Sequence, residues 1–302
     1  MKLVGLMPVR NEEWVLGLSL RAALLFVDEM VVLDHASSDG TPELLTRIAA
    51  EHPGRVHCLT ETDAVWHEAS IRQRLLRAGR TAGATHLCML DADEVLTGNF
   101  LPSIRAMFAA LAPGEELWLR WLATWRNLDT CRDGGPLWDA WDFMILGFRD
   151  APHLHYRSWE RDYDIHARRP CRTTGRRVAE QSAGGVFHLA FANWRRLRVK
   201  TAWYKMTEAV RFPWRTAAEL NAFYSYYLDE SRLATRTVDP AWWAPYAPWR
   251  GEVELDGSSW FERECQRLWG EHGAAAFAGL ELWGVPEGAG TAPRAAAGGA
   301  PA

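Results

Sequence analysis

The sequence has little of what disulfide-bonded, zinc-binding or membrane-spanning proteins need. Its 302 residues include five cysteines, an odd number, and no two of them form a C-x-x-C pair. Neither a disulfide framework nor a zinc site is indicated, and we expect a reduced, cytoplasmic protein. No apolar stretch reaches the length of a membrane span, and the first apolar run is too short for a signal peptide. We therefore expect no membrane span.

An excess of positive charge is also missing. The formal net charge is -4 at pH 7 and the isoelectric point is about 6.2, so the chain has no overall basic field that would attract phosphate backbones. We expect no nucleic-acid partner. Hydrophobic residues make up 48% of the chain, which is ample for a core. The tryptophans are unevenly spread, because all of the 17 except Trp14 and Trp66 lie after residue 117. The two halves therefore differ in character.

Strand and helix patterns alternate four times in the N-terminal third. The apolar runs that indicate buried strands are Leu3 to Met7, Met30 to Leu33, Val56 to Leu59 and His86 to Leu90. Helical patterns separate these runs, with Asn11 expected as the N-cap of the first helix and Thr41, followed by Pro42, as the N-cap of the second. This order predicts a largely parallel sheet covered by helices, in which ligands bind beyond the carboxyl ends of the strands.

Three polar clusters fall at those expected strand ends: Pro8 to Asn11, Asp34 to Thr41, and Asp91 to Glu94. The last cluster places three carboxylates within four residues, a charge density that favours a cationic partner. Mg²⁺ or Mn²⁺ held by one or two carboxylates keeps positions open for a diphosphate. The alternative is a solvated acidic turn before a helix.

The three clusters resemble the motifs of family 2 glycosyltransferases, which have the GT-A fold. The matching segments are Pro8-Val9-Arg10-Asn11-Glu12-Glu13, then Val31-Val32-Leu33-Asp34-His35-Ala36-Ser37-Ser38-Asp39-Gly40-Thr41, then Leu90-Asp91-Ala92-Asp93-Glu94. The resemblance covers about residues 1 to 100. It implies an α/β fold of GT-A type, with a Rossmann-like, mostly parallel sheet flanked by helices and a tryptophan-rich α+β C-terminal portion on the acceptor side. We expect a nucleotide-sugar-binding half over 1–115, an acceptor-binding half with a helical region over 116–284, and a disordered tail over 285–302.

The resemblance also implies a donor site and a metal site. The residues implied to bind the nucleotide-sugar are Pro8, Arg10, Asn11, Glu12, Asp34, His35, Arg72, Asp91, Ala92 and Asp93. His35 stands where many members carry a second aspartate. Asp93 is the implied principal ligand of Mn²⁺ or Mg²⁺, together with Asp91 and Glu94. His188 follows a short apolar run and is a further candidate ligand, the alternative being a local hydrogen-bonding role.

Family 2 resemblance further implies an inverting, metal-dependent transfer of the hexosyltransferase class, in which a carboxylate deprotonates an acceptor hydroxyl. Between the metal motif and His188 we favour Asp162 and then Asp164, which lie among aromatic residues, although pairing with nearby arginines is the alternative. Asp142 is a further acid in this interval. The expected partners are a nucleotide-sugar, with UDP as the default, and a small-molecule or saccharide acceptor. A homodimer is kept as an open alternative.

The basic stretch from Trp194 to Lys200 has two interpretations, a contact with the diphosphate or the solvated face of an amphipathic helix. Two other functions also stay open. A Mg²⁺-dependent phosphohydrolase uses a similar D-x-D motif, but usually after its first strand and with the first aspartate as nucleophile. A non-catalytic carbohydrate- or nucleotide-binding protein on the same fold is the other. A nucleotidyltransferase is disfavoured, because no Gly-rich loop follows the first expected strand.

Overall fold

The computed structural model describes residues 1–63, 65–134, 142–157, 167–179, 184–230, 232–257, 260–283 and 285. The chain divides into two compact units. The first contains residues 1–193 and 232–255, and the second contains residues 194–231 and 256–302.

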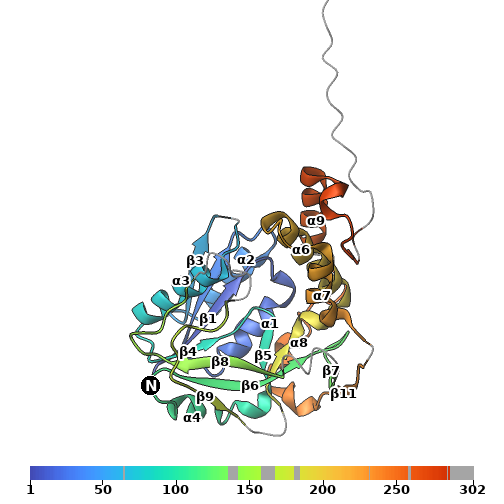
Figure 1. Ribbon diagram of the computed structural model, residues 1–302. Coiled ribbons are helices and arrows are strands. Elements are labelled where there is room, and N and C mark those ends of the chain that lie inside the picture. Colours follow the sequence, from blue (N-terminus) through green and yellow to red (C-terminus); the bar gives the residue numbers. More distant parts are fainter. Residues whose placement is uncertain are drawn as a thin grey trace, which may run out of the picture. The chain divides into compact units, whose positions relative to one another are not determined.

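The first unit is built on a nine-stranded sheet in the order β3-β2-β1-β4-β8-β6-β10-β5, with β9 beside β6 (Figure 1). The strands are β1 (Leu3–Val9), β2 (Glu29–His35), β3 (Val56–Glu61), β4 (His86–Met89), β5 (Glu94–Leu96), β6 (Glu115–Ala123), β8 (Phe143–Arg149), β9 (Gly175–Val178) and β10 (Val186–His188). Strands β1 to β4 are parallel, β8 is antiparallel to β4 and β6, and β10 is parallel to β6. The carboxyl ends of β1, β2, β4, β6 and β10 therefore lie along one edge.

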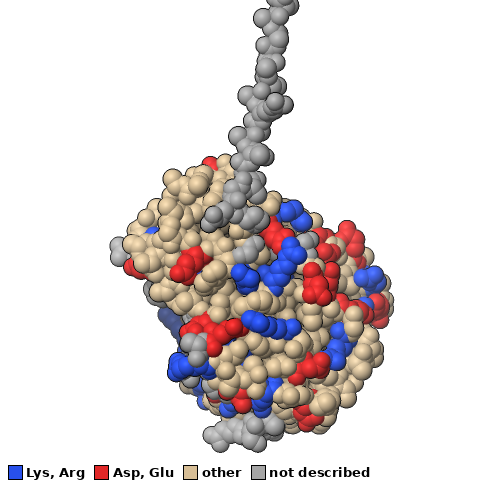
Figure 2. All heavy atoms as spheres, turned by 90° about the vertical axis from the view of Figure 1, so that its right-hand side faces the viewer, with Lys and Arg blue, Asp and Glu red and all other residues tan. Residues whose placement is uncertain are grey.

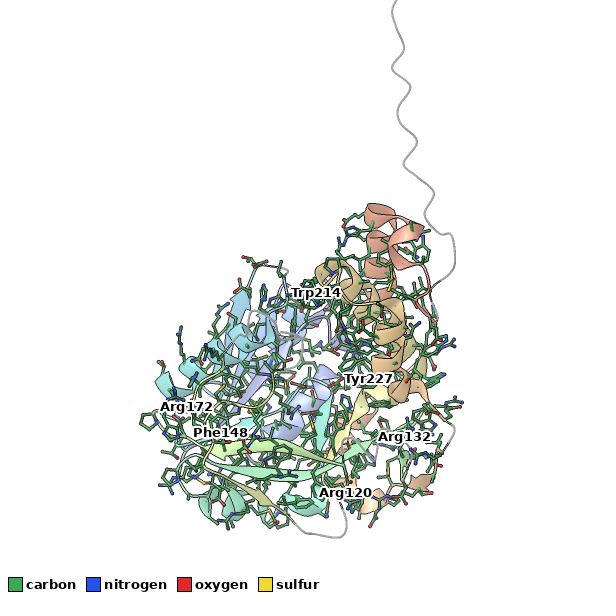
Figure 3. All side chains as sticks on the ribbon, viewed as in Figure 1. Arg120, Arg132, Phe148, Arg172, Trp214 and Tyr227 are labelled. Atoms are coloured by element: carbon green, nitrogen blue, oxygen red, sulfur yellow. The ribbon has the colours of Figure 1, made fainter. Side chains whose placement is uncertain are left out.

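Helices cover both faces of this sheet. On one face lie α1 (Glu13–Ala23), α2 (Thr41–Glu51) and α4 (Ile104–Ala109), whose apolar side chains share a core with Leu3 and Met7 of β1. On the other face α3 (Glu68–Thr81) packs against Val4 and Leu6, the alternate residues of the same strand. Phe148 of β8, labelled in Figure 3, belongs to this second core. The predicted α/β architecture, with a mostly parallel sheet flanked by helices, is confirmed.

The predicted strands and helices of the N-terminal third are all present, but two expected helix caps are wrong. Asn11 is not the N-cap of α1, since Glu12 occupies that position and Asn11 takes a left-handed φ of 55°. Thr41 is the first residue of α2, after Gly40. The physical reason is that both polar side chains bond to the neighbouring loop instead of to their own helix, and Thr41 Oγ1 accepts a 2.9 Å hydrogen bond from the Glu12 backbone N–H.

The proline- and tryptophan-rich stretch after residue 239 packs into the first unit. It forms η3 (Pro240–Trp242), η4 (Ala244–Tyr246) and α8 (Ala247–Arg250), and it follows β11 (Thr235–Thr237), which pairs with β7 (Thr130–Arg132). Trp243 stacks on Phe187 of β10 with ring centroids 4.3 Å apart, and the Tyr246 hydroxyl donates a 2.7 Å hydrogen bond to the Leu96 carbonyl of β5. These aromatic residues therefore pack against β5 and β10.

The second unit is helical and aromatic. It contains α6 (Trp194–Arg211), α7 (Ala217–Leu228), α9 (Trp260–His272) and η5 (Ala274–Phe277). The basic stretch from Trp194 to Lys200 lies at the start of α6, and Arg196 in it is buried. Lys205 of α6 is fully buried, donates a 3.0 Å hydrogen bond to the Glu281 carbonyl and lies over the Trp283 ring. The tryptophan-rich character predicted for the C-terminal portion is thus confirmed.

The surface carries no large area of one charge sign among the described residues on the face drawn in Figure 2, where acidic and basic side chains are interspersed. None of the helices in the described part of the chain has both the length and the apolar character that crossing a membrane requires. All five cysteines lie in described segments and are free thiols.

Candidate functional site

Two loops at the carboxyl edge of the sheet are joined by side-chain hydrogen bonds. Asn11, just after β1, accepts hydrogen bonds at Oδ1 from the backbone N–H groups of Ser38 (2.6 Å) and Asp39 (3.2 Å). The backbone N–H of Asn11 donates to Ser37 Oγ at 2.9 Å, and Glu13 accepts from the Gly40 N–H at 2.6 Å. The predicted clusters after β1 and β2 therefore form one polar wall, which is held together by hydrogen bonds between the two loops.

Asp34 and His35 end β2 beside this wall, and both are buried. Asp34 Oδ1 accepts a 3.2 Å hydrogen bond from the Ser37 N–H. The His35 ring meets Trp66 edge-on, with centroids 5.1 Å apart. Burial, and then the charge of Arg10, lower the pKa of His35, so this imidazole is neutral near pH 7. Where many family members have a second carboxylate, this chain therefore has a neutral aromatic contact.

The Asp91 carboxylate lies two residues after β4 and is held by two arginines. Arg72 of α3 donates from Nη2 to Asp91 Oδ1 at 2.6 Å, and Arg168 donates from Nη1 to Asp91 Oδ2 at 3.0 Å. Arg72 also donates to Glu68, one turn earlier on α3, at 3.0 and 2.9 Å. Burial opposes ionisation, but the two guanidinium groups outweigh it and lower the pKa of Asp91. Asp91 is therefore ionised at neutral pH.

Glu94 begins β5 and is nearly inaccessible, with 1% of its surface exposed. Its Oε1 accepts from Arg168 Nη1 at 2.6 Å and from Trp121 Nε1 at 3.2 Å. Its Oε2 accepts from Arg168 Nη2 at 2.7 Å and from the Asp91 N–H at 3.0 Å. Both oxygens are thus occupied, so Glu94 holds Arg168 and the turn of the motif in place. Its role as a metal ligand stays a prediction that would require Arg168 to move.

Asp93 lies beside His188, a residue 95 positions later. Strand β5 pairs antiparallel with β10, which aligns Glu94 with His188, and the Leu189 N–H donates to the Asp93 carbonyl at 2.7 Å. The side chains approach with His188 Nε2 3.5 Å from Asp93 Oδ2. The indole ring of Trp121 stacks on the imidazole with centroids 4.0 Å apart. This contact fixes the plane of the imidazole ring next to the carboxylate.

A glycine keeps β10, and hence His188, in this place. A Cβ on Gly185 would lie 2.1 Å from the Arg120 carbonyl oxygen of β6, which no side chain tolerates. Thr97 forms two hydrogen bonds with Gly185. Its Oγ1 accepts from the Gly185 N–H at 2.8 Å, and its own N–H donates to the Gly185 carbonyl at 2.8 Å. The close approach of β10 to β6 and β5 therefore depends on Gly185.

The donor set at Asp93 and His188 fits a divalent cation shared with a substrate. A carboxylate oxygen and an imidazole nitrogen are both ligands that Mn²⁺ accepts. His188 Nδ1 is buried and has no hydrogen-bond partner among the described residues, so the ring has no competing anchor there. The described part of the chain contains no group of three or more His, Cys, Asp or Glu side chains placed to hold a metal. A cation held by these two side chains would keep its remaining positions open for other oxygen ligands and water.

The remaining predicted residues take several positions. Pro8 lies within β1, Ala92 is buried, Arg10 follows β1, and Glu12 Oε2 accepts from Trp14 Nε1 at 2.5 Å. Strand β1 lies between β2 and β4, so one strand separates the Asp34 cluster from the Asp91 cluster along the edge. Asp162 and Asp164, the predicted bases, lie outside the described residues.

Sequence reasoning missed three residues that build the site: Glu68, Arg168 and Trp121. Glu68 could have been found, because it precedes Arg72 by four residues on a predicted helix. Arg168 contacts Asp91 and Glu94, which lie more than 70 residues earlier in the chain. Trp121 lies in an apolar strand pattern, which gives no sign of its contact with His188. No local pattern signals either of these long-range contacts.

A mostly parallel sheet with a carboxylate motif at its carboxyl edge and paired polar loops defines the class of GT-A-type α/β proteins. The comparison of sequences names the family: residues 6–112 match the profile described as glycosyl transferase family 2. Residues 6–112 are thus similar to family 2 glycosyl transferases, as the resemblance of the three motifs predicted for this part of the chain. No curated protein matches the chain.

Solved structures resemble parts of the chain. S. aureus TarS 1–349 is 17% identical, with a TM-score of 0.34 over 45% of this chain and 38% of that one. The mannosyltransferase PcManGT from Pyrobaculum calidifontis, in complex with GDP-Man and Mn²⁺, is 22% identical, with a TM-score of 0.33 over 42% and 36%. Glucosyl-3-phosphoglycerate synthase from Mycobacterium tuberculosis, in complex with Mg²⁺ and UDP, is 19% identical, with a TM-score of 0.31 over 40% and 43%. The matched region spans less than half of each of these structures.

Proposed function

We propose that this protein is a metal-assisted, inverting glycosyltransferase that moves a sugar from a nucleoside diphosphate-sugar to a hydroxyl of a small-molecule or saccharide acceptor. The observation that carries the proposal is the Asp93–His188 pair, 3.5 Å apart at the carboxyl edge of the sheet, with Asp93 inside the segment that matches family 2. UDP-sugars are the first donors to test, and Mn²⁺ or Mg²⁺ is the proposed cofactor.

In this proposal the loops after β1 and β2 bind the nucleoside. Asn11 holds the loop of Ser38 and Asp39, and Asp34 supplies the carboxylate that faces the ribose or the base. His35, neutral and packed on Trp66, contributes an aromatic surface and no charge. Arg10 gives the donor side a positive charge, which favours an anionic diphosphate, whereas the charge of Arg72 is paired with Glu68 and Asp91.

Asp93 and His188 would hold the metal ion. When bound, the ion would stabilise the negative charge that develops on the departing nucleoside diphosphate. Trp121 keeps the His188 ring in its plane, and Gly185 keeps β10 beside β5, so both ligands are positioned before any substrate arrives. Such preorganisation lowers the cost of assembling the site at the moment of reaction.

For the general base we keep Asp162 and then Asp164 as candidates, with Asp142 next. Asp142 immediately precedes β8, and Arg120 of β6, labelled in Figure 3, lies 3.3 Å from its carboxylate. Burial raises the pKa of Asp142, the direction that suits a proton acceptor working near neutrality. We further propose that residues 116–284 contribute the acceptor side and residues 1–115 the nucleotide side.

The phosphohydrolase alternative is disfavoured by the contacts of the motif. That reaction requires the first aspartate, Asp91, as a free nucleophile, yet both of its oxygens accept hydrogen bonds from guanidinium groups. The motif also follows β4, the fourth strand of the chain.

The test is calorimetric titration of UDP, GDP and dTDP into the protein, once with Mn²⁺ and once with EDTA. We expect one nucleotide to bind only with the metal. Asp93→Asn should abolish that metal-dependent binding. The control Asp150→Asn should preserve it, because the Asp150 carboxylate pairs with Arg80, at 2.8 Å. Equal nucleotide binding with Mn²⁺ and with EDTA, or unchanged binding in Asp93→Asn, would contradict the proposed metal site.

A further inference from the structure

Arg168 is the most heavily bonded side chain at the carboxyl edge. Besides its contacts with Asp91 and Glu94, it donates from Nη2 to the Met89 carbonyl at 3.1 Å and from Nε to the Ile145 carbonyl at 3.2 Å. A guanidinium has five N–H donors, and these contacts use all five. The Arg168 side chain is 12% exposed, so water screens the contacts little. This geometry fixes the position of the positive charge against the motif.

The charges around the motif form an ordered chain. Arg72 bridges Glu68 and Asp91, and Arg168 bridges Asp91 and Glu94. Two permanent positive charges are thus shared among three carboxylates. The Asp93 carboxylate lies beside His188, with 3.5 Å between Oδ2 and Nε2, across the pairing of β5 with β10. Glu68, Asp91 and Glu94 therefore face arginines, and Asp93 lies beside an imidazole.

We infer that Arg168 is a positioning residue that acts as a built-in counter-ion for Asp91 and Glu94, next to the Asp93 and His188 side chains that bind the divalent ion. The inference rests on the proposed function and assigns the division of labour within the motif. Because one carboxylate and one imidazole bind Mn²⁺ weakly by themselves, the ion binds tightly only together with the diphosphate. Metal and nucleotide binding are therefore coupled, and Arg168 maintains the coupling.

Two variants separate the charge of Arg168 from its hydrogen bonds. Arg168→Met removes both, so Asp91 and Glu94 become additional anions near Asp93. Arg168→Lys keeps the positive charge but offers three donors, too few for two carboxylates and two carbonyls. Arg80→Met is a matched control, because Arg80 also holds a carboxylate through Nε and Nη2, at 2.9 and 2.8 Å from Asp150, and also donates to two backbone carbonyls.

The experiment measures Mn²⁺ affinity by calorimetry with and without saturating UDP, after circular dichroism has confirmed folding of each variant. In Arg168→Met we expect Mn²⁺ affinity without nucleotide to rise about tenfold or more, because two nearby carboxylates lose their counter-ion. The mutual strengthening of Mn²⁺ and UDP binding should fall in the same variant. Arg168→Lys should keep the wild-type affinity for Mn²⁺ alone but bind UDP with Mn²⁺ more weakly. Arg80→Met should change only the melting temperature.

Three results would overturn the inference. The first is an unchanged Mn²⁺ affinity in Arg168→Met. The second is a rise of Mn²⁺ affinity both with and without UDP, which would make Arg168 a competitor of the metal instead of a support for the motif. The third is wild-type behaviour of Arg168→Lys in every titration, which also decides the matter if Arg168→Met fails to fold. Wild-type protein that binds no nucleotide would instead refute the proposed function, and the titrations with Mn²⁺ alone would still test Arg168.

Discussion

Replacing Arg72 by methionine should destabilise the protein strongly, because it leaves Glu68 buried without its partner. The Arg72 and Glu68 side chains are 3% and 8% exposed, so water cannot replace the lost ion pair. Breaking one side of a buried pair typically costs about 3–5 kcal/mol. We expect about 3 kcal/mol, the lower end of that range, because Asp91 is 34% exposed and keeps its contact with Arg168.

The pH dependence of this loss has a definite sign. Burial raises the pKa of Glu68 even with Arg72 beside it, and removing Arg72 raises it further. Between the unfolded pKa and that raised folded pKa, the folded variant binds more protons than the unfolded chain. Its stability therefore recovers as the pH falls through the folded pKa of Glu68. The destabilisation should be largest at neutral pH and smaller near the ordinary glutamate pKa of 4.5.

Urea unfolding followed by circular dichroism, at neutral and at mildly acidic pH, measures both effects. Arg74→Met is the control, because Arg74 lies on the same helix and pairs with Glu61, but both side chains are about a third exposed. An exposed pair of this kind contributes within about 1 kcal/mol, so the control should unfold close to the wild type. If Arg72→Met were no less stable than Arg74→Met at neutral pH, the buried-network argument would be refuted.

Two further substitutions test residues that hold β10 in place. Gly185→Ala should lower the free energy of unfolding by about 1–3 kcal/mol in urea and weaken Mn²⁺-dependent UDP binding, because the new methyl group displaces β10. Gly251→Ala is the control, because a Cβ at that position meets open space. Trp243→Ala should lower the free energy of unfolding by about 3–5 kcal/mol through loss of its stack on Phe187. Trp214→Ala, at a side chain 67% exposed and labelled in Figure 3, should stay within about 0.5 kcal/mol of the wild type, and equal losses in both tryptophan variants would contradict the packing described.

Much of the fold of the first 100 residues could be predicted from periodicity alone. Strands β1 to β4 are short apolar runs, and the helices between them have apolar faces at helical spacing, so local pattern and final structure agree. The positions of the three polar clusters follow from the same alternation, because parallel strands place their carboxyl ends on one edge. The segment that matches a glycosyltransferase family, residues 6–112, contains these three clusters.

The helix caps show where local reasoning failed. Asn11 and Thr41 have the residue types that cap helices, and each lies next to a helix start. Their side chains bond across to the facing loop, a choice that depends on the distance between β1 and β2. The sequence shows which side chains can form hydrogen bonds, but the tertiary structure determines which partner each of them has.

By itself the sequence determined the alternation of strands and helices, the edge at which the polar clusters meet, and the carboxylate motif that a cation would neutralise. Those properties depend on residues close together in the chain. Only the tertiary structure decided that Asp93 faces His188, that Trp121 stacks on that ring, and that Arg168 occupies Asp91 and Glu94. These contacts join residues separated by 67 to 95 positions, which no short-range spacing encodes. The alignment of β5, β6 and β10 sets the contacts of His188.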